Sequence, residues 1–230
     1  MGRWACVDVP ALPLQLLFRR EPSWREQPAC VVEDDHPQAR VLWLNEPARA
    51  ASLLPGMRYA TALALARELR AGVVGAAEIQ AGVARLAARL RDFTPDVEPS
   101  PDEPGLFWLD GEGLSRLFDS ASAWARGIHA ALTAEGFLAR VAVGFTRYGT
   151  YAVAKSGASI AVFRDPGEEQ QAARNVPLAR LGLDPELRDD LAKLGVRTLG
   201  EFLELPEGGL HERFGDQAAR LHRLASGSAW

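Results

Sequence analysis

Two acidic segments have the residue types of a metal-dependent phosphoryl-transfer site. Asp8 ends an apolar run near the start of the chain, and the pair Asp102-Glu103 stands just ahead of the apolar run LFWLD. Two-metal phosphoryl transfer needs several carboxylates close together, so that two divalent ions about 3.5–4 Å apart clamp the attacking and leaving oxygens. The sequence therefore raises the question whether the acidic pair holds a metal ion or belongs to an ordinary loop.

The prolines around the acidic pair favour a loop. Pro99, Pro101 and Pro104 flank Asp102-Glu103. Proline cannot donate a hydrogen bond to a sheet, and it pushes the residue before it towards extended geometry. We therefore expect Asp102-Glu103 to be an exposed acidic turn that binds no metal.

The elements that must position these residues alternate between strands and helices. Apolar runs at 4–9, 29–33, 40–45, 106–110 and 139–145 predict strands, whereas 48–53, 61–71, 76–93 and 120–136 have helical composition. In the segment 76–93 the apolar residues Ile79, Val83, Leu86, Leu90 and Phe93 share one helix face. This alternation predicts an α/β (α+β) fold with a sheet covered by helices. Pro10 and Pro13 should end regular structure after the first strand, and we place a domain boundary within 163–171.

Composition excludes several classes of protein. The net charge of −4 gives no overall positive field for nucleic acid, so any such contact would be local. Cys6 and Cys30 lie in apolar runs and should be buried, reduced thiols rather than a disulfide or zinc site. We find neither a membrane span nor a secretion signal, and expect a cytoplasmic protein. The last residues, 228–230, read as a tag remnant.

Four segments together resemble the catalytic half of a Y-family (translesion) DNA polymerase, most of all its ImuB-type branch. VDVPALPLQLL, EPARAASLLPGM, FTPDVEP and EPGLFWLD have the order and separations of the family's first strand, fingers loop, helix end and palm hairpin. The resemblance implies a Y-family polymerase-like palm sheet with helices (1–9 and 72–165), a small fingers subdomain (10–71) and a helical, helix-hairpin-helix-like thumb (172–227). The family's little-finger domain is expected to be absent.

Compared with that family, the metal-binding positions have changed. Asp8 matches the first metal ligand, but Pro10 occupies the second acidic position of that strand. The family's Asp-Glu pair falls on Gly105-Leu106 when counted back from LFWLD, and on Glu103-Pro104 when counted forward from FTPDVEP. We interpret Asp8, Pro10 and Gly105-Leu106 as vestigial active-site positions without catalysis or metal. Asp8 should then be a remnant, or a strand-end carboxylate bonded to backbone, that contributes little to stability.

The nucleotide-binding positions have changed as well. Arg49 is kept, but Glu46 stands where the family has the tyrosine that helps to hold nucleotide phosphates, and a carboxylate repels a phosphate. We interpret Glu46 and Arg49 as vestigial nucleotide-binding residues, and Pro13 replaces the aromatic gate that tests the ribose. In the predicted loop VGFTRYGTYAVAK, Arg147 and Lys155 are expected to be solvated surface cations rather than phosphate ligands.

The thumb hairpin is a predicted, weakened DNA contact. Gly182, Leu183 and Asp184 stand where the family has a Gly-Ile-Gly turn whose backbone N–H groups approach a DNA phosphate. Asp184 precedes Pro185 and is expected to cap the following helix with its carboxylate. That carboxylate would occupy the N–H groups and repel a phosphate.

The resemblance implies a non-catalytic scaffold, or pseudo-polymerase, in a complex for DNA-damage-induced translesion synthesis and mutagenesis. The implied partners are a RecA-like accessory protein (ImuA-type), an error-prone C-family DNA polymerase and the sliding clamp, the last through a C-terminal region expected to be missing here. No cofactor is implied. Two alternatives stay open, namely an active or residually active translesion polymerase that uses rearranged carboxylates, and a weak DNA-binding module.

Overall fold

The computed structural model describes residues 2–113 and 117–227. The predicted tag remnant at 228–230 lies outside these residues. A five-stranded sheet forms the centre, in the order β5-β6-β1-β7-β8. The central strand β1 (Trp4–Asp8) pairs antiparallel with β6 (Leu106–Asp110) and with β7 (Arg140–Gly144). The edge strands are β5 (Val97–Pro99) and β8 (Ile160–Val162).

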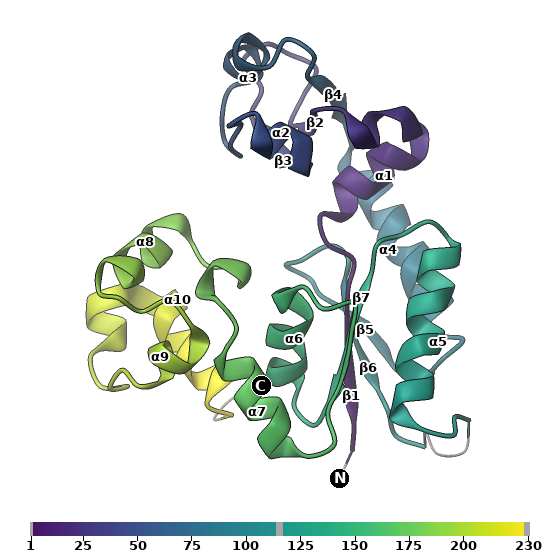
Figure 1. The fold of residues 1–230 in the computed structure, drawn as a ribbon, viewed down its shortest axis with the longest axis vertical. Helices are drawn as coiled ribbons and strands as arrows, with labels where there is room; N and C mark the ends of the chain where they lie inside the picture. Colours follow the sequence, from purple (N-terminus) through teal and green to yellow (C-terminus); the bar gives the residue numbers. More distant parts are fainter. Residues whose placement is uncertain (1, 114–116, 228–230) are drawn as a thin grey trace.

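Helices cover both faces of this sheet (Figure 1). Helices α4 (Ala76–Leu90) and α5 (Ala121–Ala134) pack on one face, where Leu86 and Leu90 are fully buried against the apolar residues of the strands. Helices α6 (Arg147–Ser156) and α7 (Pro166–Arg174) lie on the other side of the sheet. The predicted α/β class and the apolar face of the segment 76–93 are confirmed.

A second, three-stranded sheet lies beyond one end of the central sheet (Figure 1). Strand β2 (Ala29–Val32) is its middle strand, antiparallel to β3 (Val41–Leu44) and parallel to β4 (Arg70–Val73). The short helices α2 (Glu46–Ala50) and α3 (Tyr59–Leu65) complete this part, which we call the three-stranded unit.

The prediction that prolines end regular structure after the first strand was wrong for Pro13. Helix α1 (Leu12–Arg20) begins one residue before Pro13, followed by the 3-10 turn η1 (Pro22–Glu26). A proline in the first helical turn loses nothing, because the first N–H groups of a helix have no intrahelical acceptor. The α1 residues Leu14 and Leu17 pack against β2, so this helix connects the two sheets.

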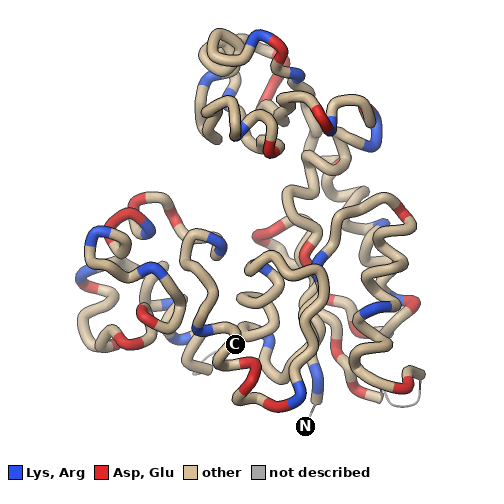
Figure 2. The backbone as a smooth tube through the Cα atoms, in the orientation of Figure 1, with Lys and Arg blue, Asp and Glu red and all other residues tan. Residues whose placement is uncertain are grey.

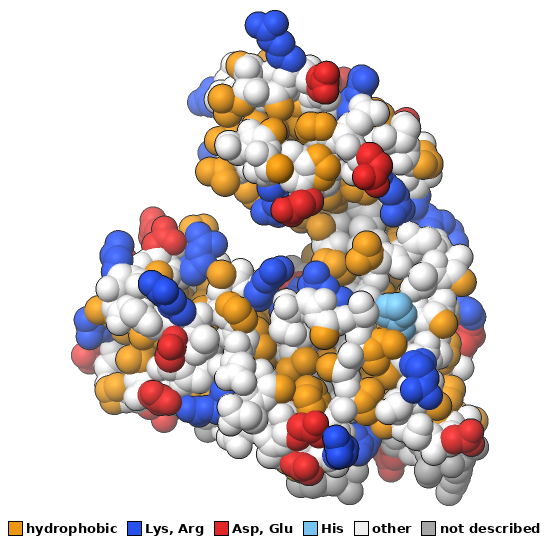
Figure 3. All heavy atoms as spheres, viewed as in Figure 1, with side chains coloured by type: hydrophobic (Ala, Val, Ile, Leu, Met, Phe, Trp, Pro, Cys, Tyr) orange, Lys and Arg blue, Asp and Glu red, His pale blue; other side chains and the backbone are white. Residues whose placement is uncertain are grey.

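The last part of the chain is helical. The short turn η3 (Leu178–Arg180) is followed by α8 (Pro185–Lys193), α9 (Leu199–Leu203) and α10 (Leu210–Ala225), which bends at Gly215. We call residues 176–227 the helical group. Figure 3 shows a deep hollow between this group and the three-stranded unit, and Figure 2 shows acidic and basic residues interspersed along the helical group.

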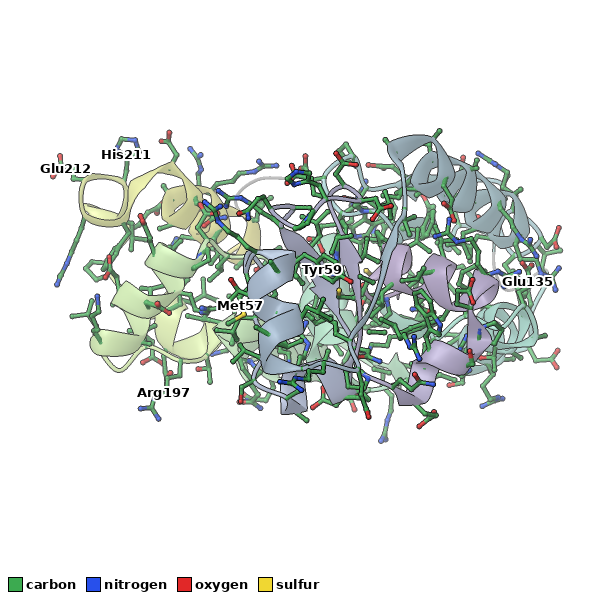
Figure 4. All side chains as sticks on the ribbon, turned by 90° about the horizontal axis from the view of Figure 1, so that it is seen from above. Met57, Tyr59, Glu135, Arg197, His211 and Glu212 are labelled. Atoms are coloured by element: carbon green, nitrogen blue, oxygen red, sulfur yellow. The ribbon has the colours of Figure 1, made fainter. Side chains whose placement is uncertain are left out.

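Several side chains mark the outer ends of the molecule. Viewed from above in Figure 4, His211 and Glu212 of the helical group lie at one end, and Glu135, after α5, lies at the opposite end. Cys6 and Cys30 are buried free thiols, as predicted. In the part of the chain that the structure describes, no helix is both long and apolar enough to cross a membrane.

Candidate functional site

The site is built around Asp8, the last residue of β1. Side chains alternate along a strand, so Asp8 faces the same side as Cys6, which packs in the core beneath α6. The Asp8 side chain is only 3 % exposed, and its Oδ1 lies 2.9 Å from Nζ of Lys155. Arg140, directly across on β7, places a guanidinium nitrogen 3.6 Å from Oδ2. Asp8 is therefore held by an ion pair, and the prediction of a backbone-bonded carboxylate was wrong.

Lys155 reaches Asp8 because residues 147–156 are a helix and not the predicted loop. Thr146 caps α6 by accepting a hydrogen bond from Gly149 N, and the last turn of α6 carries Lys155 to the end of β1. The Lys155 side chain is 15 % exposed. Our prediction of a solvated surface cation was wrong, because two carboxylates replace water around its ammonium group.

The second carboxylate belongs to Glu103. Its Oε2 lies 2.6 Å from Nζ of Lys155, and its Oε1 accepts a hydrogen bond of 2.8 Å from the hydroxyl of Tyr151. Tyr151 and Lys155 are one helical turn apart on α6, so they present both donors on one face. The prediction of an exposed turn is confirmed for Asp102 and wrong for Glu103, which folds back against α6.

The two carboxylates determine the charge state of this cluster. Burial alone lowers the pKa of Lys155, but the charges of Asp8 and Glu103 outweigh it and raise that pKa above its ordinary value. Burial raises the pKa of Tyr151, and the neighbouring Glu103 raises it further. Burial, followed by the charge of Asp8, raises the pKa of Cys6. The ammonium of Lys155 is thus a permanent cation between two carboxylates, beside a neutral phenol and a neutral thiol.

The strand register shows which residues face Asp8 from β6. Leu106 is the cross-strand partner of Asp8, and its apolar side chain is buried. Gly105 accepts a hydrogen bond of 2.8 Å from Val9 N and has a φ of 97°. A Cβ atom at Gly105 would lie 2.6 Å from the Val9 carbonyl oxygen, so only glycine fits here. Pro10 follows the end of β1, where its carbonyl accepts from Gln15 Nε2.

The predicted nucleotide-binding residues are not brought to this cluster. Glu46 begins α2 and Arg49 lies near its end, both exposed within the three-stranded unit. The Nε of Arg49 donates to the Leu44 carbonyl at 3.3 Å. Pro13 is buried in the first turn of α1. In the described ranges, no ion pair or hydrogen bond connects these residues to Asp8 or Lys155.

Arg147 is also not the solvated surface cation that we predicted. Its guanidinium carbon lies 4.9 Å from the ring centres of both Trp4 and Trp108. One of its nitrogens is 2.7 Å from Oε1 of Glu98, and the pKa of Glu98 is lowered by this hydrogen bond. Arg147 therefore fixes the start of α6 on the sheet by cation–π contacts and an ion pair.

The predicted hairpin of Gly182, Leu183 and Asp184 contacts the central part of the molecule. A Cβ atom at Gly182 would lie 3.7 Å from Oε1 of Glu103. Asp184 precedes α8 as predicted, but its carboxylate accepts no cap hydrogen bond, so the predicted capping interaction was wrong. Instead the backbone N–H of Asp184 donates to Oε1 of Gln217 at 2.9 Å, and Gln217 Nε2 donates to the Gly182 carbonyl at 3.4 Å.

A further buried carboxylate, Glu169 on α7, was missed by the sequence analysis. It is 2 % exposed and accepts hydrogen bonds from Phe145 N at 2.6 Å, Thr146 N at 3.1 Å and Thr146 Oγ1 at 2.6 Å. Glu169 thus fastens α7, within the predicted boundary segment, to the start of α6. Arg140 and Tyr151 were missed too, and only the four-residue spacing between Tyr151 and Lys155 could have indicated a pairing.

The arrangement is a buried cluster of charges rather than an open set of metal ligands. Among residues 2–113 and 117–227, no three His, Cys, Asp or Glu side chains lie close enough to hold a metal ion together. The oxygens of Asp8 and Glu103 that face each other are both bound to one ammonium group. This geometry stabilises the junction of β1, the acidic loop and α6.

Comparisons with known proteins identify relatives of this chain. Residues 7–152 match the family described as the impB/mucB/samB family. The chain is 32 % identical over 177 residues to Protein ImuB of Caulobacter vibrioides, covering 77 % of this chain and 38 % of that protein. It is 33 % identical over 151 residues to DNA polymerase IV of Moorella thermoacetica, covering 62 % of this chain and 36 % of that enzyme.

Solved structures share the fold. DinB from Sulfolobus solfataricus superimposes with a TM-score of 0.79 at 20 % identity, covering 98 % of this chain and 67 % of that one. The insertion ternary complex of Dbh DNA polymerase gives a TM-score of 0.76 at 21 % identity, covering 99 % of this chain and 68 % of that one. The present chain thus spans less than two fifths of the curated ImuB relative and about two thirds of these solved chains.

Proposed function

The chain belongs to the impB/mucB/samB family, and from this premise we propose that it is a non-catalytic, polymerase-like scaffold in DNA-damage-induced translesion synthesis. Its similarity to Protein ImuB and its Y-family polymerase fold support a role of this kind. We assign 1–9 and 72–165 to a palm, 10–71 to fingers and 172–227 to a thumb. Since the chain spans 38 % of its ImuB relative, activity and partners are proposed for the whole protein.

The observation that carries the proposal is the position of Lys155. Its ammonium lies 2.9 Å from Asp8 and 2.6 Å from Glu103, so it neutralises the two carboxylates that could otherwise bind a divalent cation. Because the cation is covalently part of the chain, a metal ion would have to displace it from a nearly buried position. Leu106, across from Asp8, supplies an apolar side chain where the family resemblance implies an acidic one.

The nucleotide and DNA contacts are proposed to be weakened as well. Glu46 is a carboxylate where the family has a tyrosine that contacts phosphate, and Arg49 donates to a backbone carbonyl of its own unit. Asp184 leaves its carboxylate exposed at the hairpin that would approach the primer duplex. A negative charge at that place repels phosphate. We infer that the fold is kept while the steps of polymerisation are lost.

The proposed partners are a RecA-like accessory protein, an error-prone C-family DNA polymerase and the sliding clamp, all in the cytoplasm. A pull-down of the purified chain with each partner separately would test this assignment. We expect retention of the RecA-like protein by this chain. Failure with all three partners, using a chain shown to be folded, would remove the support for a scaffold.

Primer extension tests the absence of catalysis. We predict that the purified chain adds no nucleotide to a primed template with either magnesium or manganese, whereas DNA polymerase IV of Moorella thermoacetica, run alongside, extends the primer. Template-directed incorporation that is lost in Asp8→Asn would contradict the proposal. A circular dichroism spectrum of Asp8→Asn must match that of the parent, so that loss of activity is not loss of fold.

One observation favours the alternative of a translesion polymerase. The identity to DNA polymerase IV of Moorella thermoacetica, 33 %, equals that to ImuB within one percentage point. Such an enzyme would have to move Lys155 out of the cluster when a metal and a nucleotide bind. The same primer-extension assay distinguishes the two functions, and Lys155→Met should raise activity only if the lysine blocks a competent site.

A further inference from the structure

A cavity of about 550 Å³ lies between the acidic loop, α6 and the helical group. Three aromatic side chains, Trp108, Tyr148 and Tyr151, line it from the sheet and α6, and Leu221 and Leu224 line it from α10. A volume of this size is typical of a pocket that accepts a ligand or a short peptide segment. The cavity lies beside the Lys155 cluster, because Glu103 and Tyr151 take part in both.

Tyr148 gives the cavity an unused hydrogen-bonding group. Its side chain is 7 % exposed, and its hydroxyl makes no hydrogen bond within the described residues, whereas the hydroxyl of the adjacent Tyr151 donates to Glu103. Buried hydroxyl groups nearly always have a partner. Burial raises the pKa of Tyr148, and Glu103 raises it further, so the hydroxyl stays protonated and can both donate and accept.

The rim of the cavity carries two opposite charges on different elements. Asp102 lies on the acidic loop, Arg220 lies on α10, and both are exposed residues that line the cavity. In the part of the chain that the structure describes, neither side chain forms an ion pair. An occupant that carries a basic group and an acidic or carbonyl group would satisfy both sides.

We propose that this cavity docks a short segment of a protein partner. The segment inserts an apolar side chain between the aromatic wall and Leu221, bonds the Tyr148 hydroxyl, and presents a basic residue to Asp102 and an acidic one to Arg220. A nucleic acid fits less well, because Asp102 and Glu103 at the rim repel phosphate. The inference rests on the scaffold function proposed above, but peptide binding and primer extension are separate measurements, so the failure of one is distinguishable from the failure of the other.

The test is selection of peptides from a random library displayed on phage against the purified chain. We expect enriched peptides that share an apolar residue flanked by one basic and one acidic residue. The tightest peptide, labelled for fluorescence anisotropy, should bind Tyr148→Phe about fivefold more weakly, because one hydrogen bond is lost. Asp102→Lys and Arg220→Glu should each weaken binding about tenfold.

Matched variants control for charge alone. Arg223→Glu changes the same charge one turn along α10, and Asp96→Lys changes an exposed acidic residue away from the cavity. Both should bind as the parent does. The proposal is overturned if no peptide is enriched, if binding ignores Tyr148, Asp102 and Arg220, or if a single-stranded oligonucleotide competes for the same site and responds to the same variants.

Discussion

The ion pair between Asp8 and Lys155 gives a prediction of stability that can be worked from its geometry. At 2.9 Å and an effective dielectric constant near 20, the gross attraction is about 6 kcal/mol, most of which offsets the desolvation of both charges. Asp8→Asn leaves Lys155 paired with Glu103, so we expect a loss of about 2 kcal/mol. Lys155→Met leaves both carboxylates without their ammonium, and we expect a loss of about 3 kcal/mol. These values replace the small contribution of Asp8 that the sequence predicted.

A double-mutant cycle isolates the pair. If the double variant loses about 3 kcal/mol, the coupling energy is about 2 kcal/mol, measured as free energies of unfolding in urea with unchanged m-values. Arg20 and Glu78 provide the matched control, since they are also 2.9 Å apart but with side chains 46 % and 34 % exposed. Their coupling should stay below about 1 kcal/mol.

The response to pH gives a second readout of the same pair. The pKa of Lys155 is raised in the folded state, so its stabilisation is present below the pKa of the unfolded chain and is lost only as pH rises through the raised value. The coupling should therefore persist from about pH 7 to about pH 9, below the ordinary lysine pKa. A coupling below about 0.5 kcal/mol at neutral pH would refute the reasoning, because the charges would then be solvated.

Two further substitutions test the helix termini of the second half of the chain. Asp184→Ala should cost less than about 0.5 kcal/mol in urea unfolding, because its carboxylate makes no cap bond, whereas Thr198→Ala, which removes a complete capping box, should cost about 1 kcal/mol; equal losses would contradict the geometry. Glu169→Gln should lower stability by about 2–3 kcal/mol, because an amide cannot accept from three donors, and the exposed neighbour Glu168→Gln should cost less than about 1 kcal/mol; a similar loss in both would show that burial of Glu169 is unimportant.

Local patterns predicted the central elements of the fold. The strand at LFWLD and the helix from residue 76 were predictable because each shows its own periodicity, apolar throughout for the strand and one face in four or three for the helix. Helix α6 was not, because its first turns hold Tyr148, Gly149 and Thr150, which are poor helix formers. Tertiary packing on β1 and β7 compensates for this weak propensity.

The candidate site was predicted in part. Comparison with the family indicated Asp8 and the apolar Leu106, which the strand register places opposite each other. The pairing with Lys155 was not predictable, because Asp8 and Lys155 are 147 positions apart and no local pattern joins them. Glu103 was misjudged for a related reason, since prolines predict a loop but not which of its side chains folds inward.

The position of Lys155 also explains how this fold tolerates an incomplete set of carboxylates. A buried aspartate at the end of β1 is costly without a cation, whether the cation is a metal or a side chain. Lys155 supplies that charge from α6, and Glu103 completes its coordination from the acidic loop. Adding an acidic residue at Leu106 alone would therefore give the lysine a third carboxylate to neutralise. A metal could bind in its place only after the ammonium is removed as well, which makes Lys155, rather than any single missing carboxylate, the residue that stabilises the present state of the site.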